Sequence, residues 1–223
     1  MTIIVLVVLA LVATRRLKII PGRFQAAVEF VTDYIYTFCK EVAGEKNGRR
    51  FFPWVMTIFI FVITNAILAQ LPFWNSLTIV NAQGTAVPLL RNPNTDANLP
   101  LALALISFVV VGYFGIKEHR LRFIGQYVRL GALRHGPKAF IDIFVGMLEL
   151  LSVFMRIVSF TFRLFGNMTA GEILVLMIMF LVPWIASIPF YCLELFLGYI
   201  QALIFAGLTL VFLTVAVGHH EVE

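Results

Sequence analysis

Apolar residues along this chain fall into long blocks, and short polar segments separate the blocks. The blocks at 51–71 and 99–117 are close to the roughly 20 residues that a helix needs to cross a bilayer, so each predicts one crossing helix. Another helix is predicted over 1–20. Its strictly apolar part, 1–13, is short for a crossing. Either residues 1–13 are part of a longer first helix, or residues 16–20 extend the crossing because their basic side chains can reach the membrane surface.

The two remaining blocks, 137–181 and 184–217, are longer than a bilayer is thick. No proline interrupts the first block, which would form a helix of roughly 65 Å against a hydrocarbon core of roughly 30 Å. Such a helix either tilts strongly or breaks near Gly166 or Gly171. Because Pro183 and Pro189 mark a turn between the blocks, we predict a long, tilted, antiparallel hairpin of two helices.

The segment 21–43 has a different pattern, with apolar residues at helical spacing opposite charged ones. It predicts an amphipathic helix at the membrane surface, or a loop helix packed on the protein. A polar turn is predicted at 44–50 and an outer loop at 73–98. The fold class is therefore all-α and polytopic. About five crossing helices and one surface helix form a single membrane domain over 1–223.

The composition supports this fold class. Hydrophobic residues make up 61% of the chain and charged residues 13%, and the mean hydropathy is +0.94, which excludes a soluble domain. The two cysteines, Cys39 and Cys192, have no spacing typical of a metal site, so we expect no metal and no cofactor. The sequence also contains no H-E-x-x-H motif and no Walker A loop, which argues against an intramembrane protease and a nucleotide site.

Basic residues alternate between the polar segments: eight lie in 15–50, one in 72–98 and six in 117–138. By the positive-inside rule, the first and third segments are cytoplasmic, so the N-terminus lies outside and the C-terminus in the cytoplasm. Because these short loops explain the net charge of +5, we expect no nucleic-acid partner. The basic residues are Arg15, Arg16, Lys18, Arg23, Lys40, Lys46, Arg49 and Arg50, then Arg91, then Lys117, Arg120, Arg122, Arg129, Arg134 and Lys138.

One arginine, Arg163, lies near the middle of the predicted helix 137–181. A charge at the centre of a bilayer costs at least about 2.5–3.5 kcal/mol, so such residues are usually functional. At about 100° per residue, Glu149 and Asn167 share its face, together with Asp142, Arg156 and Ser159. Glu172 lies about 180° away. On the next helix, Glu194 and Gln201 share one face.

Acids therefore approach Arg163 from both membrane surfaces without forming a continuous line. Buried carboxyl groups can relay protons, whereas an arginine stays charged, so the pattern suggests two half-paths separated by an electrostatic barrier. The alternative is that Arg163 pairs with an acid of this chain and only holds helices together. Arg156 and Asp142 are more readily explained by contacts with lipid headgroups.

The motif Arg163-Leu164-Phe165-Gly166-Asn167-Met168, followed by Ala170-Gly171-Glu172, resembles the signature of the subunit a family of F-type ATP synthases. The resemblance covers nearly the whole chain. Further matching segments are Pro21-Gly22, Phe51-Phe52-Pro53, Leu71-Pro72, Pro93 with Asp96, and Gln201-Ala202-Leu203-Ile204-Phe205.

This resemblance implies a membrane stator beside a rotating c-ring, with peripheral-stalk b subunits as further partners and no nucleotide site or enzyme activity of its own. Arg163 would separate two half-channels and make each ring carboxyl release its proton. Asn167 and Gln201 would line the region around it. Glu172 and Glu194 would line the outer half-channel with Asp96 near its mouth, and Glu149 would belong to the cytoplasmic one. The implied location is a bacterial-type plasma membrane.

Two departures from the family pattern affect this interpretation. Many relatives have one acid and one histidine where this chain has Glu172 and Glu194, so two carboxyls could share a proton here. The N-terminal segment is also short for the family, so the first helix starts late or the sequence is trimmed. The alternative functions are a stand-alone proton or sodium channel or carrier, an intramembrane enzyme, and a structural subunit of a respiratory complex.

Overall fold

The computed structural model describes residues 2–14, 22–71, 78–80, 86–88, 96–119, 138–182 and 187–218. Its helices are α1 (Thr2–Thr14), α2 (Arg23–Ala69), α3 (Asn98–His119), α5 (Lys138–Leu181) and α6 (Ser187–Gly218). The last four are long and apolar enough to cross a membrane, and α1 is a shorter apolar helix. The all-α, polytopic class predicted from the sequence is confirmed.

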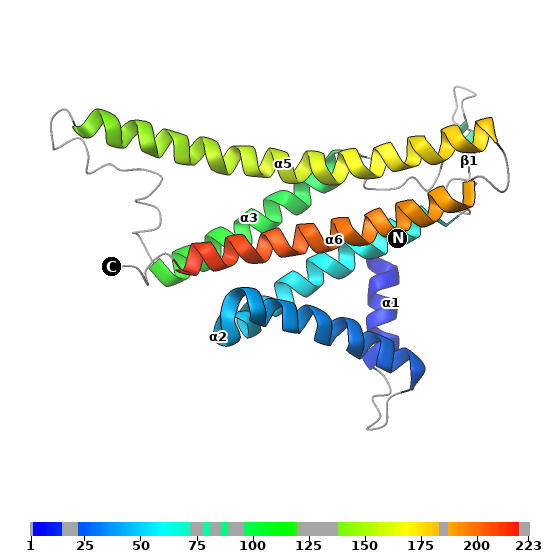
Figure 1. Cartoon of the computed structure of the whole chain (residues 1–223), viewed down its shortest axis with the longest axis horizontal. Helices are drawn as coiled ribbons and strands as arrows, with labels where there is room; N and C mark the ends of the chain where they lie inside the picture. The colour runs from blue at the N-terminus through cyan, green and yellow to red at the C-terminus, as the bar shows by residue number, and fades with distance from the viewer. Residues whose placement is uncertain are drawn as a thin grey trace.

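α2 contains two segments that the sequence suggested were separate. Residues 23–43 and 45–69 are both helical, and the chain turns between them at Gly44, where φ is 77° and ψ is 169°. Glycine adopts a positive φ without a Cβ clash, so a single residue makes this corner (Figure 1). The polar turn predicted over 44–50 is therefore wrong, because residues 45–50 already belong to the next helix.

The two arms of α2 pack closely at this corner. A Cβ on Gly48 would lie 2.7 Å from the backbone oxygen of Cys39, so only glycine permits this approach. Farther from the corner, the rings of Tyr36 and Phe52 meet edge to face with centroids 5.3 Å apart. The amphipathic arm is thus attached to the span that follows it.

The predicted outer loop contains a feature that the sequence did not indicate. Strands β1 (Thr78–Val80) and β2 (Ala86–Pro88) pair antiparallel, with Ile79 opposite Val87. Each strand has three residues, too few for alternation to be recognised against the surrounding asparagines and prolines. Most of the remaining loop lies outside the described residues, as do most of the basic segment at 117–138 and His219 and His220.

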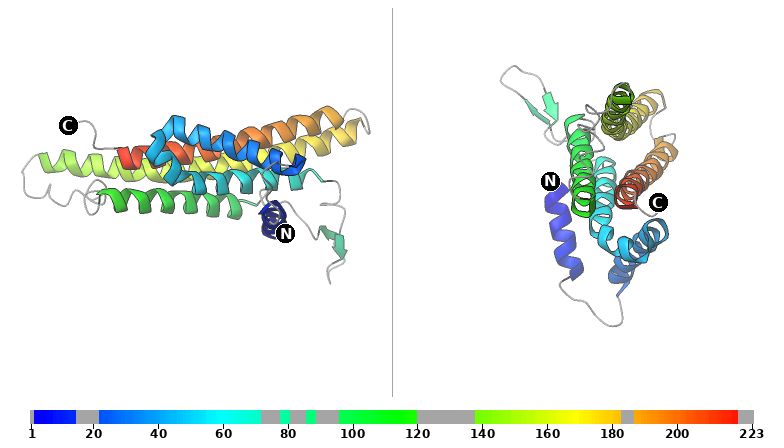
Figure 2. Two further views of the ribbon diagram at one scale, coloured as in Figure 1. Left: turned by 90° about the horizontal axis from the view of Figure 1, so that it is seen from below. Right: turned by 90° about the vertical axis from the view of Figure 1, so that its left-hand side faces the viewer.

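α5 and α6 form the long antiparallel hairpin, and they lie side by side in all three views (Figures 1 and 2). α5 is one continuous helix of 44 residues, so the alternative of a break near Gly166 or Gly171 is wrong. This helix is about 66 Å long, roughly twice the thickness of a bilayer core. α1 runs across the direction of the hairpin in Figure 1, and the tilt of the hairpin in the membrane stays a prediction.

The core of the molecule surrounds α6, which packs against α2, α3 and α5. Phe160 of α5 inserts among three aromatic rings, at centroid distances of 4.8 Å from Phe205, 5.7 Å from Phe212 and 5.8 Å from Phe108. Burial of large apolar side chains is the main stabilising contribution in this region. The fully buried residues of α6 include Ala202, Phe205, Leu210 and Leu213.

The short helix α1 is joined to this core by a polar contact. The Thr2 hydroxyl donates a 2.7 Å hydrogen bond to Oδ1 of Asn65, and both residues are buried. Hydrogen bonds between polar side chains commonly connect helices in an apolar environment, where each group otherwise lacks a partner. The other face of α1 is exposed, with Ile3 and Leu11 each more than half accessible.

Candidate functional site

Arg163 lies on an exposed face of α5, and it has no carboxylate partner among the described residues. Its Nη2 lies 3.4 Å from the hydroxyl oxygen of Ser159, and its guanidinium lies 5.9 Å from the Phe160 ring centroid. These contacts orient the side chain but leave its charge unneutralised. No acid in the described part of the chain neutralises this guanidinium.

The surroundings of Arg163 leave space for such a partner. Phe162 is 64% exposed, and a Cβ built on Gly166 would meet no atom within 4 Å. Asn167, one turn beyond Arg163, is partly buried at the edge of the same face. The opposite face, with Leu164 and Met168, is buried. α5 thus buries one face and presents Arg163 on another.

Gln201 lies at about the level of Arg163, on α6. Gly171 of α5 contacts Glu194 of α6, so in this antiparallel pair Gln201 is level with Leu164, next to Arg163 in the sequence. Gln201 is 3% exposed, and its Nε2 has no hydrogen-bond partner among the described residues. A buried amide without a partner is costly, which is typical of a position that water or a functional group reaches.

Glu172 and Glu194 line one small cavity of about 60 Å³ between α5, α6 and the end of α2. The sequence placed them on different helices, and the structure brings them together. Gly171 makes this approach possible, because a Cβ there would lie 2.9 Å from Oε1 of Glu194. Each acid is partly buried. Two carboxyl groups so placed can share or exchange a proton.

The same cavity contains Gln70, which sequence reasoning missed. Gln70 follows the last residue of α2, and its side chain lies within interaction distance of Glu194, which also interacts electrostatically with Glu172. One signal was available: Gln70 is a polar residue in the final turn of an otherwise apolar span. Ala69, Val175, Leu176 and Tyr191 complete the lining of the cavity.

The structure does not bring the remaining candidates into this cavity. Glu149 is partly buried on the Arg163 side of α5, about 21 Å before it along the axis. Asp96 is exposed before α3, where its Oδ1 accepts hydrogen bonds of 3.1 Å from the Asn98 backbone N–H and 3.0 Å from the Asn98 amide. Asp96 thus shapes the start of a helix. The side chain of Asp142 lies outside the described residues.

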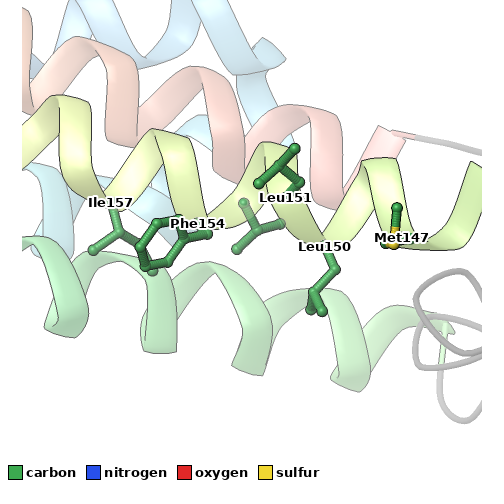
Figure 3. A pocket seen from close by; sticks show the side chains of 6 residues that line it. Met147, Leu150, Leu151, Phe154 and Ile157 are labelled. Atoms are coloured by element: carbon green, nitrogen blue, oxygen red, sulfur yellow. The ribbon is translucent and has the colours of Figure 1, made fainter.

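A larger cavity is apolar and holds no candidate chemistry. It has a volume of about 520 Å³ and lies along the first half of α5, where Leu150, Phe154 and Ile157 point toward α3 (Figure 3). Met147, Leu151 and Val153 complete its lining. In the described part of the chain, no three histidines, cysteines or acids are grouped so that they could hold a metal ion.

Comparison with known proteins identifies a family and curated relatives. The family described as "ATP synthase A chain" matches residues 1–214. A curated relative, "ATP synthase subunit a, chloroplastic" of Stigeoclonium helveticum, is 32% identical over 215 residues. The match covers 96% of this chain and 80% of the relative. Both matches include Arg163 and the pair Glu172 and Glu194 within the aligned length.

Proposed function

We propose, from the premise that this chain belongs to the ATP synthase A chain family, that it is the stator of a rotary proton motor. The family forms the Fo proton channel and works with other subunits of the complex, and the chain itself supplies no nucleotide chemistry. In our proposal, Arg163 faces a ring of c subunits, and two half-channels deliver protons to the ring carboxylates and receive them back. Proton flow then drives rotation and ATP synthesis.

The exposed guanidinium of Arg163, which has no acidic partner among the described residues, is the observation that carries this proposal. A cation in an apolar environment is stabilised by an anion, and a moving ring carboxylate becomes that anion when it gives up its proton. Because arginine does not release its own proton, it cannot pass one from one half-channel to the other. The same residue therefore drives deprotonation and prevents a leak.

The outer half-channel in this proposal includes Glu172 and Glu194, with Asp96 near its mouth. Asn167 and Gln201 line the space around Arg163, and the buried, unpartnered amide of Gln201 supports water or a proton path at that level. Glu149 belongs to the cytoplasmic half-channel. A stand-alone channel or carrier would have to neutralise Arg163 within its own chain, and the described residues offer no acid that does so.

Substitution of Arg163 tests the mechanism. Arg163→Ala is expected to reduce ATP-driven proton pumping in inverted vesicles at least about 100-fold, because a centrally placed charge is lost. Arg156→Ala is the matched control: Arg156 is also an exposed arginine of α5 and is expected to retain pumping. Both variants should insert in normal amounts. Normal pumping by Arg163→Ala would refute the mechanism.

Crosslinking tests the partner. A Gly166→Cys variant, made in a Cys192→Ser background because Cys192 is exposed, is expected to crosslink to a small two-helix membrane protein of the ring. Cysteine at Ala202, which is fully buried in α6, is the control and should not react. Equal crosslinking from both positions, or none from Gly166→Cys, would argue against a ring seated on α5.

We propose a plasma membrane of bacterial type as the location, and the alternation of basic segments supports an orientation with the N-terminus outside and the C-terminus in the cytoplasm. Peripheral-stalk b subunits are proposed as further partners, and the surrounding bilayer covers the exposed apolar side chains of α1. A membrane-impermeant thiol reagent that labels an Arg23→Cys variant, in the same Cys192→Ser background, only from the cytoplasmic side would support this orientation. Labelling from the outside would reverse it.

A further inference from the structure

We propose that Gln70 is a positioning residue that holds the Glu194 carboxyl against Glu172 in the outer cavity. This inference rests on the proposed function, because it concerns the path by which protons reach Arg163. Three elements converge on the cavity: the end of α2 supplies Gln70, α5 supplies Glu172 and α6 supplies Glu194. Of these three side chains, only that of Gln70 does not ionise and so cannot relay a proton.

The geometry restricts the Glu194 carboxyl on two sides. On one side it lies against the backbone of Gly171, where even a methyl group would overlap it at 2.9 Å. On another side the Gln70 amide lines the same small cavity, within interaction distance of the carboxyl. A carboxyl group has two oxygens, so an amide bound to one leaves the other available to Glu172, which interacts with Glu194 across the cavity.

The position of Gln70 in the chain suits this role. It is the residue after the last turn of α2. Its backbone N–H donates a 3.2 Å hydrogen bond to the carbonyl oxygen of Ile67, and the N–H of the next residue, Leu71, donates one of 3.3 Å to Leu68. The backbone is thereby fixed, and only side-chain torsions separate it from the carboxyl. Positioning by a fixed neighbour lowers the cost of reaching the reactive geometry, although the neighbour takes no part in the chemistry.

The groups that face the carboxyl pair determine how the pair responds to pH. Glu172 and Tyr191 are the titratable residues that line the cavity beside Glu194, and they come from α5 and α6. α2 contributes Gln70 and Ala69, neither of which titrates. A change at Gln70 therefore alters the pH profile of proton conduction only through the arrangement of the acids.

Passive proton conduction through Fo, in membrane vesicles stripped of F1 and driven by a potassium gradient, tests this inference. Gln70→Met keeps the length of the side chain and removes its hydrogen-bonding amide. It is expected to slow conduction about fivefold and to displace the pH profile, as loss of one hydrogen bond predicts. Gln70→Asn, which keeps the amide, should recover part of the rate. Leu71→Met, beside Gln70 but outside the cavity lining, is the matched control.

A double change separates positioning from a general structural effect. In a Glu194→Gln background, Gln70→Met should cause no further loss, because the carboxyl that it positions is gone. Additive losses, or a normal rate and pH profile in Gln70→Met, would overturn the inference. Failure of the proposed function has a different result: Arg163→Ala would then pump normally in the ATP-driven assay, and Glu194→Gln would conduct at the normal rate.

Discussion

α5 and α6 are two arms of one hairpin, yet they are used in opposite ways. In their most apolar 18-residue stretches, 22% of the α5 residues are buried, against 39% in α6. α6 is surrounded by α2, α3 and α5, whereas α5 leaves large apolar side chains such as Phe162 and Phe180 exposed. Similar hydrophobic sequences thus produce a helix that holds the fold and a helix that faces outward.

This difference suggests how the charge of Arg163 is tolerated. Placed on α6, an arginine would be enclosed by the chain and would need a permanent partner. On α5 it lies on an exposed face, where our proposal places a partner that changes as the ring turns. The buried polar residue at the same level of α6 is neutral Gln201. The hairpin therefore separates structural support from an exchangeable contact.

The same substitution in each arm gives the largest expected contrast. Phe205→Ala in α6 removes a ring that is 1% exposed and should lower the free energy of unfolding by about 3–5 kcal/mol. Phe162→Ala in α5 removes a ring that is 64% exposed, and should change it by at most about 0.5 kcal/mol. Thermal unfolding in detergent, followed by circular dichroism, measures both. Equal losses would contradict the division between the arms.

Two glycines provide a smaller contrast. A Cβ on Gly198 of α6 would lie 2.7 Å from Cβ of Ala66, so Gly198→Ala should destabilise the fold by about 1–3 kcal/mol. Gly166→Ala on α5 meets open space, and should stabilise the isolated chain by up to about 1 kcal/mol through helix propensity. The same unfolding measurement distinguishes the two signs. Destabilisation by Gly166→Ala would show that this α5 surface is more closely packed than the contacts indicate.

The smallest expected effect concerns a contact between the arms. The Arg156 guanidinium lies 5.0 Å from the ring centroid of Phe212, a cation–π arrangement worth about 0.5–1 kcal/mol. Arg156→Gln and Phe212→Leu, alone and together, form a double-mutant cycle that isolates this energy. A coupling energy indistinguishable from zero would mean that the contact between Arg156 and Phe212 does not stabilise the fold.

The fold class could be predicted from the sequence because a chain of long apolar blocks and short basic loops can satisfy its backbone hydrogen bonds in a membrane in few ways other than as crossing helices. The corner at Gly44 could not. A polar stretch before an apolar span is typical of a loop, and only the positive φ of one glycine shows that the next helix starts at once. The break considered at Gly166 or Gly171 does not occur, and only Gly171 packs closely against α6, whereas Gly166 faces open space within an unbroken helix.

The site was predictable only in part. Helical spacing grouped Arg163 with Asn167 and placed Glu172 on the other side of α5. It contains no information on contacts between helices, so it could not show that Gln70 meets Glu194. For the same reason, Asp96 could be matched to a family position, while its hydrogen bonds with Asn98 were visible only in the structure.

A tilt of the hairpin, as the length of its helices predicts, would have an electrical consequence. Along α5, Glu149 and Glu172 are about 35 Å apart, and in a tilted helix much of that separation runs sideways in the plane of the membrane. A potential of 100 mV is worth about 2.3 kcal/mol for each charge that crosses it. If protons enter near one of these acids and leave near the other, their carrier must travel sideways to complete the crossing. The membrane potential then drives movement of that carrier sideways, in the plane of the membrane.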